Sequence, residues 1–183
     1  MFFTLWKNNK DCVLSDLCLI VYIFSKSSHM KEFYNVNEFK AKAKENLPKE
    51  SYEYLKGGAE DERTLQRNIS EYQNFQIRPR RLVNVTNVDT SVNILGEKWK
   101  SPIFLCPVGT QGIFHEDGEK ATARAAHNKD HLMIVSTLAT FSYAEIAAQM
   151  TRKPWFQLYP TENLEIAKVL IRRAEENLSL IHI

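Results

Sequence analysis

With 183 residues, 44% of them hydrophobic and 25% charged, the chain has the composition of one globular domain. A formal net charge of +2, without a basic run interleaved with aromatics, argues against a nucleic-acid-binding protein. The three cysteines, Cys12, Cys18 and Cys106, have neither metal-site nor CxxC spacing, so we expect reduced thiols and a cytoplasmic protein.

The two ends of the chain differ from the part between them. Residues 13–24 are apolar but contain Asp16, and they are fewer than the roughly 20 residues that span a membrane. We expect residues 1–29 to be a non-native upstream extension; the alternative is a signal peptide or an anchor that holds the protein at the membrane periphery. We also expect residues 178–183, "LSLIHI", to be a non-native tail, which leaves residues 30–177 as the native part of a fragment.

Three helices are predicted before the first strand. Residues 37–47 have apolar side chains at helical spacing behind Asn37, a good N-cap residue. Pro48 opens a second helix, since proline is tolerated at a helix start, and Gly57 stops it. Residues 60–72 carry one apolar stripe with no glycine or proline, which predicts the third helix.

The remainder of the chain predicts a parallel sheet. Short strands are expected near residues 83–88 and 92–95, with Gly96 as a turn, and residues 103–108 form a continuous apolar run typical of a buried parallel strand. Three β-α units follow one another, which indicates parallel strands with helical crossovers. Their strands are residues 103–108, 131–137 and 155–159, and their helices are residues 117–129, 142–150 and 161–177.

A doubly wound sheet and a (β/α)8 barrel both fit this order. No GxGxxG follows the first strand, so the dinucleotide fingerprint is absent. Small and polar residues instead follow each strand, and the carboxyl ends of barrel strands form the active face. These residues are Gly109 and Thr110, Ser136 and Thr137, and Gln157 and Tyr159. We therefore predict an α/β (β/α)8 barrel, of which the helical segment and the first three to four units are present.

Several motifs occur in an order that resembles the FMN-dependent 2-hydroxy-acid oxidases and dehydrogenases. They are "YEYLKGGAEDE", "CPVGTQGIFHEDGEKATARAA", "IVSTLATFSYAEIA" and "WFQLY", within residues 33–177. The resemblance implies a barrel that oxidises a small L-2-hydroxy acid to the 2-oxo acid and reduces FMN. It also implies a homo-tetramer in the full-length parent.

The resemblance places five residues against the flavin. Pro107, Val108 and Gly109 match the strand-end stretch that lies on the ring, where a small residue lets the backbone approach closely. Ser136 matches a serine that hydrogen-bonds the flavin. Gln157 matches an amide that pairs with its pyrimidine edge, and an amide offers the donor and the acceptor that this edge needs. Read without the resemblance, Gln157 is a hydrogen-bonded amide in a core strand.

Three further residues match substrate contacts. Tyr54 is the tyrosine that reaches the substrate carboxylate from the helical segment, and Tyr159 is the active-site tyrosine that steadies charge on the substrate oxygen. Leu138 stands where glycolate-type members carry a large aromatic, which favours L-lactate. Pocket size discriminates weakly, by about 1–3 kcal/mol per methylene.

Two essential groups of the family lie beyond this sequence. The catalytic histidine and the arginine that binds the substrate carboxylate follow later strands, and none of the five histidines here matches that motif. We expect this fragment to be inactive by itself. The alternatives are a noncatalytic partner of a full-length barrel subunit and a different flavin- or phosphate-binding barrel.

Overall fold

The computed structural model describes residues 33–177. The expectations for residues 1–29, including the apolar stretch 13–24, and for the tail 178–183 fall outside the described residues. Within the described part, no helix combines the length and the apolar composition that a membrane crossing requires.

The first two predicted helices are present. Helix α2 (Val36–Asn46) is capped by Asn35, whose side chain accepts a hydrogen bond from the backbone N–H of Glu38 at 3.2 Å, so Asn37 is not the cap. Helix α3 (Lys49–Lys56) follows Pro48 and ends at Gly57, as predicted. The two helices share a small core with the loop that follows the first strand of the sheet. Its buried members are Phe39, Ala43, Leu47, Tyr52, Leu55 and Phe114.

The third helix is shorter than the sequence predicts. Helix α4 spans Arg63–Ser70 and passes into the 3-10 helix η1 (Glu71–Asn74). Glu60 and Glu62 have φ angles of +50° and +56°, and the left-handed conformation cannot continue a right-handed helix. The helix therefore begins three residues later than expected.

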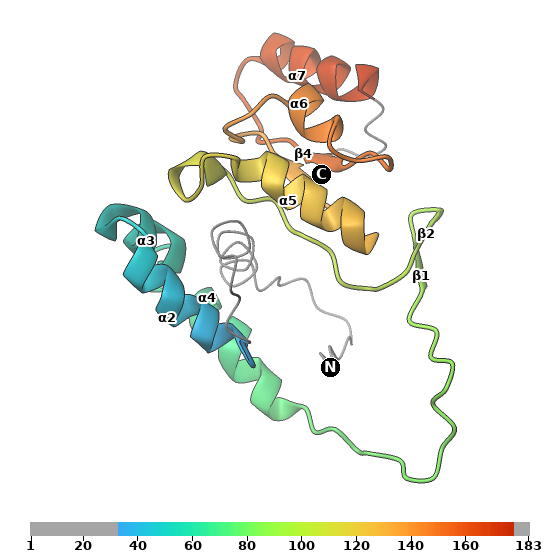
Figure 1. Cartoon of the computed structure of the whole chain (residues 1–183). Helices are drawn as coiled ribbons and strands as arrows, with labels where there is room; N and C mark the ends of the chain where they lie inside the picture. The colour runs from blue at the N-terminus through green and yellow to red at the C-terminus, as the bar shows by residue number, and fades with distance from the viewer. Residues whose placement is uncertain (1–32, 178–183) are drawn as a thin grey trace.

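The strand predicted near residues 83–88 is wrong. From residue 75 to residue 91 the chain is extended but forms no ladder with any described residue, and Leu82, Val83, Val85 and Val88 are exposed. Figure 1 shows this green segment running far outside the body of the molecule before it returns to the hairpin. A β-branched pattern indicates a strand only where a neighbouring edge is available to pair with it.

The strand expected near residues 92–95 and the turn at Gly96 are confirmed, and a second strand that was not predicted completes a hairpin. Strand β1 (Val92–Ile94) pairs antiparallel with β2 (Glu97–Trp99), and Gly96 takes a φ of +88° in the turn. That value lies in the left-handed region that glycine adopts without steric cost.

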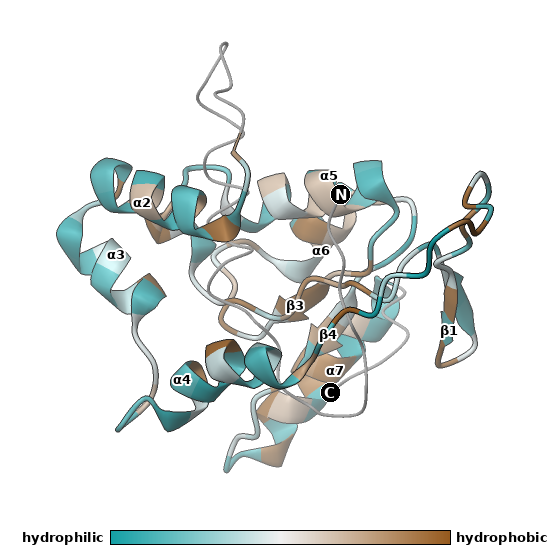
Figure 2. Cartoon of the chain, turned by 90° about the horizontal axis from the view of Figure 1, so that it is seen from below, coloured by the Kyte–Doolittle hydropathy of each residue, from teal (hydrophilic) through white to brown (hydrophobic). Residues whose placement is uncertain are grey.

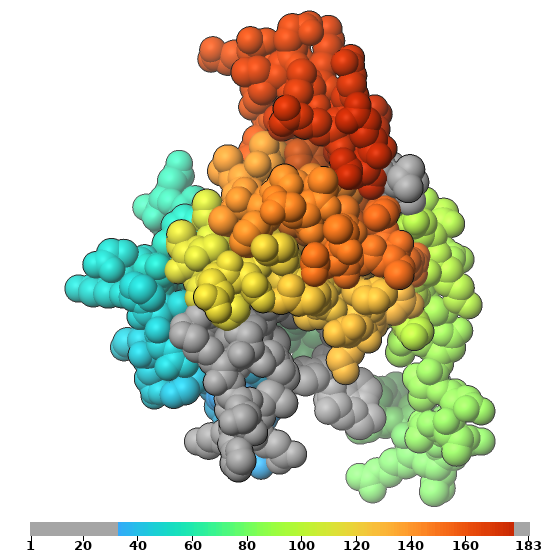
Figure 3. All heavy atoms as spheres, turned by 45° about the horizontal axis from the view of Figure 1, so that its top comes forward, coloured from blue at the N-terminus to red at the C-terminus, as the bar shows by residue number. Residues whose placement is uncertain are grey.

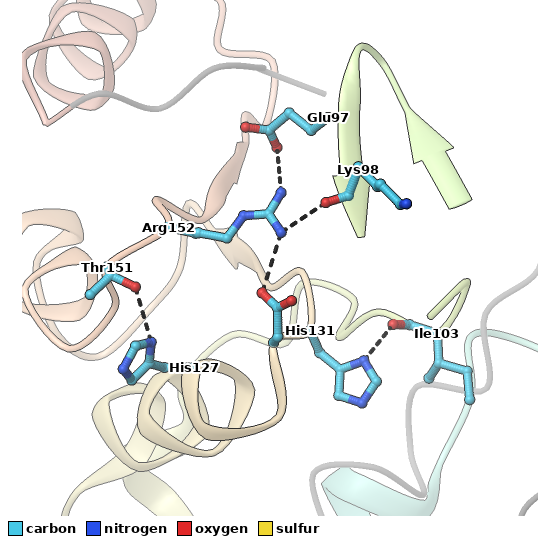
Figure 4. Close-up of polar contacts among 8 residues, drawn as sticks. Glu97, Lys98, Ile103, His127, His131, Thr151 and Arg152 are labelled. Atoms are coloured by element: carbon cyan, nitrogen blue, oxygen red, sulfur yellow. Dashed lines mark hydrogen bonds and ion pairs between the residues drawn. The ribbon is translucent and has the colours of Figure 1, made fainter. Parts of the chain in front are cut away.

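Arg152 ties this hairpin to the sheet (Figure 4). Its guanidinium donates to the Lys98 carbonyl at 3.0 Å and to Asp130 at 3.3 Å, and lies 3.9 Å from the Glu97 carboxylate. The guanidinium carbon also lies 3.4 Å from the centre of the Trp99 ring. One side chain thus joins the hairpin to the turns before β3 and β4 through both polar and cation–π contacts.

The sheet has the predicted parallel order. Strand β3 (Ile134–Ser136) pairs in parallel with β4 (Trp155–Gln157), and a parallel bridge from Leu105 to Met133 adds the first strand segment on the opposite edge of β3. The first predicted strand, residues 103–108, is therefore present only as this single bridge.

Helices alternate with these strands, as the β-α rhythm requires. The 3-10 helix η2 (Gln111–Ile113) and helix α5 (Gly118–Lys129) follow the first strand segment. Helix α6 (Tyr143–Ala147) joins β3 to β4, and α7 (Leu164–Glu176) follows β4. Figure 2 shows hydrophobic residues on β3, β4 and part of α7.

Two buried clusters line the sheet. One joins α5, β3 and α6, through Ala123, Ala126, Met133, Val135, Ile146 and Met150. The other joins the hairpin to both strands, through Trp99, Leu132, Ile134 and Trp155. Helix α7 is covered less, with Leu164, Ile166 and Val169 exposed, and it projects from the body in Figure 3.

Cys106 corrects the expectation about thiols. It is disulfide-bonded, so the prediction of a reduced thiol is wrong for Cys106, while Cys12 and Cys18 lie outside the described residues.

Candidate functional site

The loops after the first two strand segments lie against each other. The Thr110 N–H donates to the Leu138 carbonyl at 2.9 Å. A Cβ added to Gly109 would stand 3.1 Å from the Leu138 Cβ and 3.6 Å from the Ser136 Oγ. The backbone at Gly109 therefore lies directly beside Ser136 and Leu138.

Ser136 and Gln157 are neighbours across the sheet. They are register partners in the parallel ladder of β3 and β4, and paired residues of a ladder point to the same face. Ser136 is buried, while Gln157 is half-buried. The Ser136 Oγ accepts a 3.2 Å hydrogen bond from the Leu138 N–H, which fixes the turn behind it.

Thr137 braces the end of β4. Its hydroxyl donates to the Gln157 carbonyl at 2.6 Å and accepts from the Tyr159 N–H at 2.9 Å. A single hydroxyl thereby holds the backbone on both sides of Leu158. Because the orientations of Gln157 and Tyr159 follow from that backbone, Thr137 sets both.

Changing Thr137 to valine should loosen this end of β4 without unfolding the chain. Valine keeps the branched shape but leaves the Tyr159 N–H without its acceptor, at a cost of about 1–2 kcal/mol. Amide hydrogen exchange should quicken at Tyr159, while Val135 in the middle of β3 stays protected. Unchanged exchange at Tyr159 would show that the Thr137 hydroxyl does not hold this backbone. The control is Thr161→Val, a similar change further along the same loop.

Tyr54 approaches from the helical segment. Its ring stacks on the buried Phe114 ring with centroids 6.3 Å apart, and the Ser51 hydroxyl donates to the Ile113 carbonyl at 3.2 Å. These contacts hold α3 on the loop that follows Gly109. Tyr54 remains 62% exposed, so its hydroxyl end is accessible. Its approach to the substrate stays a prediction.

The remaining predicted residues lie at the same strand ends. Pro107 and Val108 are half-buried, and Val108 packs against the core of the helical segment. Leu138 is 57% exposed and Tyr159 is 49% exposed, so both present accessible side chains. The roles of all eight predicted site residues remain predictions.

The sequence analysis missed a buried carboxylate beneath these loops. Glu119, in the first turn of α5, is 0% exposed, and its Oε1 accepts the N–H groups of Gln111 and Thr140, each at 3.0 Å. A weak signal was available, because Glu119 shares a helical face with Thr122, Ala123 and Ala126, a stripe of otherwise small residues.

A second charged pair near these loops, Arg124 and Asp117, is accessible to solvent. The Arg124 guanidinium, hydrogen-bonded to Asp117, holds the pKa of that carboxyl below its ordinary value. Among the described histidines, His115 lies in the loop before α5, His127 is exposed on α5, and the Nδ1 of His131 donates to the Ile103 carbonyl at 3.0 Å. None of these histidines follows the carboxyl end of β3 or β4.

The family profile of the FMN-dependent dehydrogenases matches residues 43–179. Glycolate oxidase of Spinacia oleracea is 42% identical over 144 residues, which cover 79% of this chain and 39% of the relative. Peroxisomal (S)-2-hydroxy-acid oxidase GLO4 of Oryza sativa subsp. indica is 41% identical over 141 residues, 77% of this chain and 38% of the relative. The chain thus spans about two fifths of the length of these relatives.

Solved structures agree. A lactate oxidase of Pediococcus acidilactici superposes with a TM-score of 0.78 at 30% identity, over 84% of this chain and 43% of that one. A soluble mutant of (S)-mandelate dehydrogenase from Pseudomonas putida gives 0.74 at 33% identity, over 80% and 42%. The described residues are the helical segment and the leading β-α units of a (β/α)8 barrel that is not closed here. From the profile match and the shared fold, the chain belongs to the FMN-dependent dehydrogenase family.

Proposed function

We propose that the protein to which this chain belongs oxidises an L-2-hydroxy acid, L-lactate in particular, to the 2-oxo acid with FMN. The observation that carries the proposal is the juxtaposition of Gly109, Ser136 and Gln157 at the carboxyl ends of adjacent strands. When bound, FMN supplies the two-electron acceptor of the oxidation.

The residues present fit a flavin ring. At Gly109 the neighbours leave little room for a side chain, so the backbone itself faces Ser136 and Leu138. The Gln157 side chain offers both a donor and an acceptor. The backbone carbonyl of Gln157 is held in place by the Thr137 hydroxyl, which leaves the side-chain amide available. A flat ligand with alternating donors and acceptors matches this set.

Substrate contacts would come from exposed side chains around that set. The Tyr159 hydroxyl would stabilise charge on the substrate oxygen as the alcohol carbon is oxidised, and Tyr54 would contact the carboxylate. Leu138 leaves more room than an aromatic ring at the same place, which supports lactate over glycolate.

The 183-residue chain by itself should not turn over substrate. Oxidation of the alcohol requires a base for the hydroxyl proton and a cation for the carboxylate. None of the described histidines follows the carboxyl end of β3 or β4, and Arg152 is engaged at the opposite end of the sheet, beside the hairpin.

Replacing Gln157 with leucine should weaken FMN binding by about tenfold, since one or two hydrogen bonds to the flavin edge are lost. The measurement is a titration of flavin fluorescence with the full chain, and Gln73→Leu, an exposed amide in η1, is the control. We expect saturable binding that needs excess FMN, with no lactate-dependent bleaching. Equal affinity in the Gln157 and Gln73 variants would overturn the flavin site, and lactate turnover by the chain alone would overturn the claim of an incomplete site.

A noncatalytic role as an interaction partner is the second candidate. Within the described residues β4 has a strand neighbour on one side only, and α7 exposes Leu164, Ile166 and Val169. Such an edge can pair with another barrel subunit. Light scattering should then detect a complex between this chain and a full-length relative, and Val169→Glu should abolish it.

We also propose that the full-length parent is a tetramer and that it is located in the cytoplasm. The rice relative is named a peroxisomal enzyme, and the disulfide at Cys106 removes the argument from reduced thiols. Fractionation of cells that express the full chain would decide between a cytoplasmic and a membrane-associated or organellar form.

A further inference from the structure

Glu119 is the buried acidic side chain for which the proposed reaction gives no role. It is 0% exposed, and its Oε2 has no hydrogen-bond partner among the described residues. An unpartnered carboxylate oxygen in the interior is costly, so a residue chosen only for stability would be expected to be apolar here.

The other carboxylate oxygen joins two loops that are distant in sequence. Oε1 accepts the Gln111 N–H, from the loop after the first strand segment, and the Thr140 N–H, from the loop after β3. Hydrogen bonds to a charged acceptor are stronger than those between neutral groups. One atom therefore fixes the distance between the two loops.

Close packing around this atom leaves little freedom. The Gly112 N–H donates to the Thr140 hydroxyl at 2.9 Å, which adds a second link between the same two loops. Gly118, with a φ of +38°, lets the start of α5 approach the Gln111–Gly112 backbone, where an added Cβ would stand 3.0 Å from the Gly112 nitrogen. The loops and the helix start thus form one tightly packed unit with Glu119 inside it.

We propose that Glu119 is a positioning residue that sets the relative placement of the Gly109 backbone and the Ser136–Leu138 turn. The two loops it joins begin at these residues, and the Thr110 N–H to Leu138 carbonyl bond lies between them. The effect on the flavin rests on the proposed function, whereas the link between the loops stands without it.

Replacing Glu119 with methionine tests the link directly. Methionine fills similar volume but accepts no hydrogen bond, so exchange of the Gln111 and Thr140 amides should accelerate by about tenfold or more. Glu119→Gln keeps a carbonyl oxygen for both N–H groups and should largely restore protection. The matched control is Thr122→Val, which removes the 2.6 Å bond from the Thr122 hydroxyl to the Gln111 side chain and leaves Thr140 untouched.

FMN titration of the same variants separates the inference from the proposed function. We expect the methionine variant to bind FMN about tenfold more weakly, with glutamine in between and Thr122→Val near the parent. Accelerated exchange at both amides with unchanged FMN affinity would overturn the positioning role and leave the proposed function intact. If exchange rises across the whole sheet rather than at these two amides, Glu119 stabilises the core in general and does not position the two loops. A parent chain that does not bind FMN would count against the proposed function, while the exchange data would still decide the loop link.

Discussion

Changing Trp99 to alanine should lower the free energy of unfolding by about 3–5 kcal/mol. Trp99 is 2% exposed and belongs to the cluster that joins the hairpin to β3 and β4. It also carries the Arg152 guanidinium on its ring face. The substitution therefore removes one of the two tryptophans of that cluster and leaves a half-buried cation without its stacking partner.

The indole nitrogen contributes little to this effect. Trp99 Nε1 has no hydrogen-bond partner among the described residues, so its contribution comes from burial and from the ring contact. Trp99→Phe keeps a ring and should cost less than half as much. Urea unfolding followed by far-UV circular dichroism measures both changes, because the loss of an indole would disturb fluorescence. A cost below about 1 kcal/mol for alanine would contradict the arrangement of the hairpin on the sheet.

The elements that the sequence predicts well are those whose signal is local. Helix α3 begins after Pro48 and ends at Gly57, and the turn of the hairpin is at Gly96, as expected from the residues themselves. Helix α4 starts late because Glu60 and Glu62 adopt left-handed conformations. Glutamate rarely adopts this conformation, so the sequence pattern does not predict it.

Strands depend on their neighbours, and prediction fails where these are absent. Residues 83–88 have the composition of a strand, but no described residue pairs with them. Residues 103–108 have an equally clear apolar signal, yet only Leu105 forms a bridge, to Met133. The composition of these segments indicates extended backbone. Whether such a segment pairs with another strand depends on the rest of the fold.

The candidate site divides in the same way. Gly109, Ser136 and Gln157 were predictable because a strand end followed by a small or polar residue marks the active face of a barrel. Thr137 and Glu119 instead form hydrogen bonds with backbone groups that are distant in sequence. The partners of Thr137 are 20 and 22 residues away along the chain, and Thr140, a partner of Glu119, is 21 residues away. Their roles follow from three-dimensional contacts, and residue type alone gives only a weak indication.

Changing Gly112 to alanine should destabilise the same loop pair by about 1–3 kcal/mol through overpacking. A Cβ at this position would stand 2.6 Å from Thr140 Cγ2 and 2.9 Å from Thr140 Oγ1, closer than atoms can approach. Either Thr140 must rotate and lose the hydrogen bond from the Gly112 N–H, or the two loops must separate. In the second case the Thr140 N–H is drawn away from Glu119.

Removing the opposing side chain should rescue the variant. Thr140→Ala deletes the atoms that the new methyl group would meet, so the double variant Gly112→Ala with Thr140→Ala should recover most of the loss. The expected coupling between the two changes is about 0.5–3 kcal/mol, as for other residues in direct contact. Urea unfolding of the four proteins in this cycle measures it, and strictly additive effects would show that the loops do not meet at Gly112. Since the clash is purely steric, the rescue should not depend on pH.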